Sequence, residues 1–238
     1  MLFEGVKLMS EESRAIEEVA KTAGKFIDAT VQFCEFISSY TKEPLEQVKG
    51  IFVDKLKYYK WENQMKLMIK ANDFSKLNGL SEPNEPIKLK FAVPLLEAAS
   101  MEDDDYLQDL WAKLLVNSAN KESNVELTRN YIDILEHLSP FEAKILEKIY
   151  SLPFEEIQHE GVATKNLPET VDIATNETYK DVIENEKLKL ALANLAMLGC
   201  ISLTRTVGGG EFFGIVNPTI LGKYFIKACT LRNEIKII

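Results

Sequence analysis

The sequence predicts a mainly α-helical protein, in which a helical bundle with long N-terminal helices is followed by a small α+β module. Apolar residues recur at helical spacing as far as Tyr150 in the 238-residue chain. Beyond Leu152 the pattern turns polar and weakly periodic, and two short β-like runs flank a glycine triplet near the end. We therefore expect two domains, a helical bundle over residues 1–138 and the small module over residues 139–238.

The first expected element is a long amphipathic helix. Ser10, followed by Glu11 and Glu12, is typical of a helix start, because a hydroxyl and early carboxylates satisfy free amides and the helix dipole. Apolar residues then recur with 4-3 spacing as far as Tyr40, which gives a helix of roughly 45 Å. Such a face must be buried against the rest of the chain, another subunit or a membrane surface, and the sequence leaves the three open.

A second helix is expected after Thr41, with Pro44 in its first turn, where a missing amide costs nothing. Its apolar pattern allows a continuation towards Asn78 and Gly79, which predict an end because both tolerate the left-handed conformation. The apolar face would carry Leu45, Val48, Phe52, Leu56 and Tyr59, with Met65, Met68 and Ile69 in the continuation.

Two helices flank an acidic corner at residues 102–105. The second of them places Trp111 among leucines at helical spacing, so we expect Trp111 to be core. Clustered carboxylates suit a divalent cation, but an ion loop needs alternating ligands and usually a glycine turn, and this corner has neither. We therefore expect these carboxylates to cap and charge the start of the helix that carries Trp111.

Two further helix starts follow a reciprocal capping pattern, in which a serine hydroxyl and a glutamate three residues later satisfy exposed amides. The pairs are Ser123 with Glu126 and Ser139 with Glu142. The two helices would carry Leu127, Tyr131 and Leu135, and then Ile145, Leu146 and Ile149.

The C-terminal region changes character. Residues 153–182 have no assignable pattern. Residues 184–198 then predict a helix with Leu188, Leu192 and Leu195 inward and a stop at Gly199. Residues 200–207 and 211–216 predict a hairpin around the glycine triplet, and Asn217 and Pro218 open a last helix. Helix, hairpin and helix in this order are typical of a winged-helix-like module.

Composition narrows the class of protein. A net charge of −9 argues against a protein that coats nucleic acid, and no apolar run approaches the ~20 residues that span a bilayer. Three widely spaced cysteines, Cys34, Cys200 and Cys229, suit buried thiols in a reducing compartment. The first residues lack the charge and apolar pattern of a secretory signal, so we expect a cytoplasmic protein.

No motif predicts catalysis. His137 and His159 lie outside any metal or triad spacing, and the three cysteines have no neighbouring base or orienting group. The glycine triplet at residues 208–210 is followed by a strand and lacks the lysine of a phosphate loop. We therefore expect no enzyme activity, no metal and no cofactor.

Three segments of the chain carry a family resemblance. They read EPLEQVKGIFVDKLKYYKW, VPLLEAASMEDDDYLQDLWAKLLVNSAN and YIDILEHLSPFEAKILEKI. This pattern, over residues 43–150, resembles the Abi-alpha family of bacterial and archaeal proteins linked to abortive infection, a form of phage resistance. The resemblance implies a defence context and carries over no catalytic residue.

The sequence thus favours a non-enzymatic anti-phage protein that acts through contacts with a protein partner or a second copy. Near the family motif we expect contacts at Asp104, Asp105 and Lys113, and in the C-terminal module at Lys187, Lys189 and Arg205.

Two alternatives stay open. One is a winged-helix DNA-binding regulator, although residues 139–238 carry 11 basic against 13 acidic side chains, which disfavours nucleic acid. The other is an effector that lays its N-terminal helix, with Phe26 and Phe33, on a membrane surface, although we do not expect a membrane partner.

Overall fold

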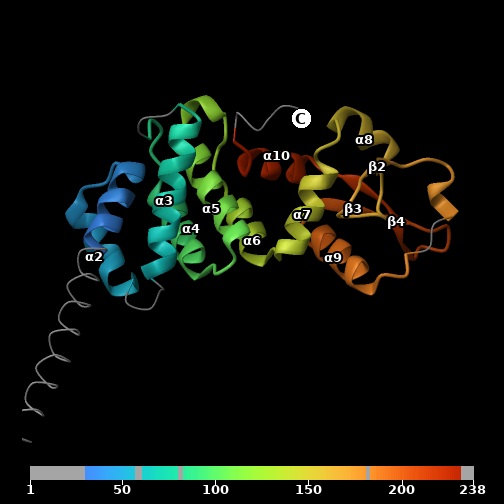
Figure 1. The fold of residues 1–238 in the computed structure, drawn as a ribbon, viewed down its shortest axis with the longest axis horizontal. Coiled ribbons are helices and arrows are strands. Elements are labelled where there is room, and N and C mark those ends of the chain that lie inside the picture. Colours follow the sequence, from blue (N-terminus) through green and yellow to red (C-terminus); the bar gives the residue numbers. More distant parts are fainter. Residues whose placement is uncertain (1–29, 57–60, 80–82, 181–182, 232–238) are drawn as a thin grey trace, which may run out of the picture.

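The computed structural model describes residues 30–56, 61–79, 83–180 and 183–231, which form a mostly helical, elongated molecule (Figure 1). We call residues 30–137 the helical half and residues 139–231 the C-terminal module. The only sheet in the described part of the chain has four antiparallel strands and lies in the C-terminal module. The predicted fold class, mainly α with a small α+β module, is confirmed. None of the described helices is long and apolar enough to cross a membrane.

The helical half holds a helix over residues 30–41 and five labelled α-helices. These are α2 (Leu45–Leu56), α3 (Trp61–Leu77), α4 (Leu89–Met101), α5 (Asp105–Ser118) and α6 (Arg129–His137), with the 3-10 helix η1 (Lys121–Ser123) between the last two.

The C-terminal module mixes helices with four short strands. Its elements are α7 (Pro140–Ile149), α8 (Phe154–Glu160), β1 (Val162–Ala163), β2 (Asp172–Ile173), the 3-10 helix η2 (Thr178–Lys180), α9 (Glu186–Met197), β3 (Ile201–Arg205), β4 (Glu211–Pro218) and α10 (Ile220–Ala228).

The N-terminal helix is packed into the fold where the structure describes it. The predicted start at Ser10 and the residues up to 29, including Phe26, lie outside the described residues. Within residues 30–41, Phe33 and Ile37 are fully buried, and the Tyr40 carbonyl accepts a hydrogen bond from the Ile87 amide. The rest of the chain therefore buries this part of the apolar face.

The second predicted helix covers two described helices, α2 and α3, and residues 57–60 between them, including Tyr59, lie outside the described residues. The Pro44 carbonyl accepts hydrogen bonds from the Gln47 and Val48 amides, as expected for a proline at a helix start. Gly79 has φ +71°, which confirms the predicted left-handed end after α3.

One of the two predicted capping boxes is present. The Ser139 hydroxyl accepts a hydrogen bond from the Glu142 amide, and the Glu142 carboxylate accepts one from the Ser139 amide. The prediction for Ser123 is wrong: this hydroxyl donates to the backbone carbonyls of Asn117 and Asn120, and the N-cap position of α6 is Thr128, five residues later. Asn124 adopts a left-handed conformation, which prevents a helix from starting at Ser123.

The sheet has the strand order β2-β1-β4-β3. The predicted hairpin is confirmed as β3 and β4, with Gly209 at φ +84° in its turn. β1 pairs with β4 from within the segment that had no assignable pattern. Asn217 and Pro218 end β4 and do not open the last helix, which is capped by the Thr219 hydroxyl on the Gly222 amide.

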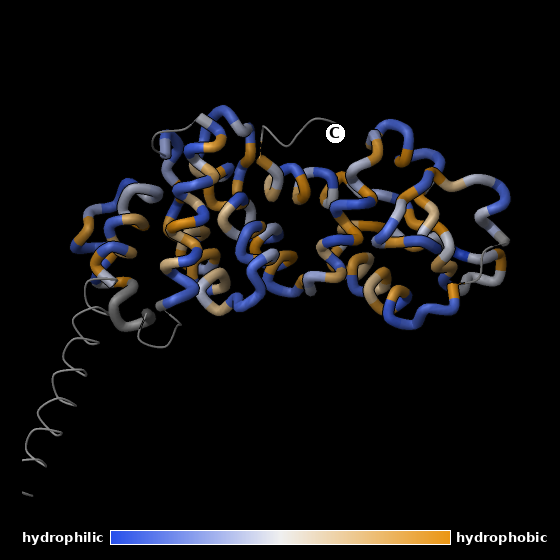
Figure 2. The backbone as a smooth tube through the Cα atoms, viewed as in Figure 1, coloured by the Kyte–Doolittle hydropathy of each residue, from blue (hydrophilic) through white to orange (hydrophobic). Residues whose placement is uncertain are grey.

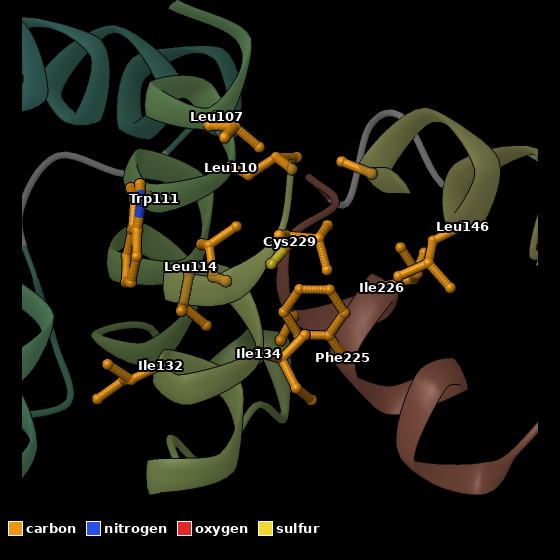
Figure 3. Packing of buried hydrophobic residues seen from close by; sticks show 14 of the residues in the cluster. Leu107, Leu110, Trp111, Leu114, Ile132, Ile134, Leu146, Phe225, Ile226 and Cys229 are labelled. Carbon is orange, nitrogen blue, oxygen red and sulfur yellow. The ribbon is translucent and has the colours of Figure 1, made fainter. Parts of the chain in front are cut away.

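The hydrophobic core runs without interruption from the helical half into the C-terminal module. Apolar residues recur along the helices of both halves (Figure 2). The last helix, α10, packs against α5 and α7: Phe225 and Cys229 lie on the side of the α5 leucines, and Ile226 lies beside Leu146 of α7 (Figure 3). The Asn117 side chain donates hydrogen bonds to the carbonyls of Ala228 and Thr230 at 2.8 and 2.9 Å. These bonds hold the end of α10 against α5, in the helical half.

Candidate functional site

The acidic corner caps a helix, as predicted. The Asp104 carboxylate accepts hydrogen bonds from the amides of Tyr106 at 3.0 Å and Leu107 at 3.1 Å, so it is the N-cap of α5. The Glu102 carboxylate accepts a hydrogen bond from the Asp104 amide at 2.8 Å, and Asp103 accepts one from the Asn63 side chain of α3 at 3.0 Å. Each of these carboxylates has a role in holding the corner.

The next acidic residues join α5 to α3. Lys66 pairs with Asp105 at 3.3 Å, and Lys70 pairs with Asp109. Within the described ranges no three metal-ligating side chains come together. The carboxylates of this region therefore connect helices, and Asp105 keeps an exposed side chain as a candidate for contact.

Trp111 is core, as predicted, with a side chain that is 1% exposed. About two turns along α5 from the acidic corner, Lys113 is half-buried, and its ammonium lies 5.7 Å from the centre of the Phe74 ring. This contact holds the lysine stem along the α3–α5 boundary.

The basic candidates of the C-terminal module lie on α9 and β3. The Lys187 ammonium is 4.2 Å from the centre of the Phe141 ring, and Lys189 pairs with Glu186 at 2.7 Å. Arg205 is exposed at the end of β3. The six predicted contact residues thus fall into two groups, one on α5 and one in the C-terminal module (Figure 1).

The cysteines are poor nucleophiles. All three thiols are free and buried. Burial raises the pKa of Cys200 to about 12 and also raises the pKa of Cys34 and Cys229, so these thiols stay protonated at neutral pH. His137 Nδ1 donates a hydrogen bond to the Asp133 carbonyl, 2.7 Å away, within its own helix.

The outer face of α9 carries an apolar stripe that the sequence interpretation missed. Leu190 and Met197 are 64% and 80% exposed, while the inward residues Leu192 and Leu195 are fully buried. Glu186, Leu190, Ala193 and Met197 follow one another at spacings of four, three and four, which places them on one side of the helix. Leu190 and Met197, which lie off the inward pattern, were the available signal, and we call these four residues the α9 stripe.

Comparison with known proteins assigns the chain to one family. The model of the family described as Abortive infection alpha matches residues 62–229. The match extends the resemblance seen in the sequence, which ended at residue 150, through almost the whole C-terminal module. No curated protein and no solved structure matches the chain.

Proposed function

The chain belongs to the Abortive infection alpha family, and on that basis we propose that it protects a bacterial culture against phage by binding another protein, without chemistry of its own. We place this action in the cytoplasm. The defence function comes from the family, and the surface that we propose for the protein contact is the α9 stripe.

The observation that carries the protein-contact mechanism is the exposure of Leu190 and Met197 on α9. Large apolar side chains that gather on one exposed face mark interaction sites more often than scattered ones do. Glu186 at the start of the stripe and Lys187 beside it carry charges of opposite sign, which resembles the polar rim of a protein interface. The stripe also lies inside the segment that the family model matches.

The test is survival of a bacterial culture under phage challenge. Cells would express the intact chain or a variant with Leu190→Glu and Met197→Glu, and we expect the variant to lose protection while the protein still folds. A control with Ile69→Glu and Leu77→Glu adds the same charge at two exposed apolar positions of α3 and should keep protection. Point variants are preferable to removal of residues 139–238, because α10 is part of the packing of α5.

The outcomes separate the parts of the proposal. Loss of protection only in the α9 variant, with a protein that co-purifies with the intact chain, supports contact through the stripe. If the partner is a second copy, light scattering will show a larger particle for the intact chain than for the α9 variant. Protection that survives the α9 variant contradicts the stripe as the contact surface, and no protection by the intact chain contradicts the defence function.

A DNA-binding regulator is the second candidate. The order of α9, β3 and β4 is that of a winged helix, and Lys187 and Arg205 are exposed on it. Binding to a short duplex should then weaken steeply with salt and disappear when Lys187, Lys189 and Arg205 are replaced by alanine together. Against this candidate, the α9 stripe presents an acidic residue and apolar residues where a recognition helix offers basic and amide groups.

A further inference from the structure

We draw no further inference here: the strongest candidate, the groove with an acidic rim that Pro94 and Met101 of α4 and Glu136 of α6 line, carries none, because nothing in the described part of the structure shows what covers it.

Discussion

The helices α5 and α9 have similar lengths, 14 and 12 residues, and both begin with a side-chain cap, yet their surfaces differ. α5 is enclosed by α3, α4, α6, α7 and α10, and its acidic start is held by capping bonds and ion pairs. α9 packs on β3 and α7 through one face and leaves Leu190 and Met197 on the other. The charged residues that the sequence singled out near α5 therefore help to stabilise the fold, whereas the exposed apolar residues of α9 had no predicted role.

The largest expected loss of stability comes from a substitution in the buried face of α5. Trp111→Ala should lower the free energy of unfolding by ~3–5 kcal/mol, because it removes a large, fully buried side chain and leaves a cavity. Urea denaturation followed by circular dichroism measures the loss. A decrease below ~1 kcal/mol would show that the centre of the helical half is far looser than the structure indicates.

The next largest expected effect on stability comes from the buried hydroxyl of Tyr150, and it depends on pH. The Tyr150 hydroxyl donates to the Cys200 carbonyl and accepts from the Thr219 amide, and burial raises its pKa to about 12, against ~10 in the unfolded chain. The folded state holds this proton more tightly, so the stabilisation is complete below pH ~10 and is lost as the pH rises to about 12. The expected loss is roughly 2–3 kcal/mol.

Chemical denaturation at several pH values measures this effect, with Tyr150→Phe as the comparison. The variant is less stable at neutral pH, since it leaves the Thr219 amide without its acceptor, but its stability should fall less between pH 10 and about 12. Parallel pH profiles for the two proteins would assign the alkaline loss to other groups.

The caps should behave alike in the two helices. Asp104→Ala in α5 and Asn185→Ala in α9 each remove a side chain that accepts from helix amides, and each should cost ~1 kcal/mol of unfolding free energy. Thermal unfolding of the two variants side by side measures the difference. If only Asp104→Ala matters, the start of α9 is held by something other than its cap.

The smallest effect concerns the α9 stripe. Leu190→Ala should change the free energy of unfolding by less than ~0.5 kcal/mol, because the side chain is largely exposed. Leu192→Ala, two residues away on the buried face, should cost ~2–5 kcal/mol in the same denaturation experiment. A large loss for Leu190→Ala would mean that this face is already covered within the folded chain or its assembly.

Much of the fold could be predicted because its signals are local. The Ser139 cap, the glycine that ends α9 and the β3–β4 turn each depend on a few neighbouring residues. Ser123 failed as a cap because its hydroxyl found closer backbone carbonyls, a competition that the same few letters do not reveal. β1 could not be predicted from the sequence, because two residues make no periodic pattern and its partner β4 lies some fifty residues away.

The candidate surfaces depend on contacts between distant segments. The groove lined by Pro94 and Met101 of α4 and Glu136 of α6 needs these two helices side by side over α5, and no spacing within either helix predicts it. The α9 stripe was closer to prediction, since Leu190 and Met197 lie off the inward pattern of Leu188, Leu192 and Leu195. An extra apolar stripe on a predicted helix can only be assigned to core or surface once its neighbours are known.

The packing of α10 against α5 has a consequence for the synthesis of the chain on the ribosome. Asn117 leaves the ribosome long before Ala228 and Thr230, the residues whose carbonyls it binds. Until the last helix emerges, the side of α5 that carries Leu110 and Leu114 lacks its cover. A chain whose synthesis stops early therefore presents an open apolar face to proteases and to other unfinished chains. The helical half can therefore complete its packing only after α10 has been synthesised.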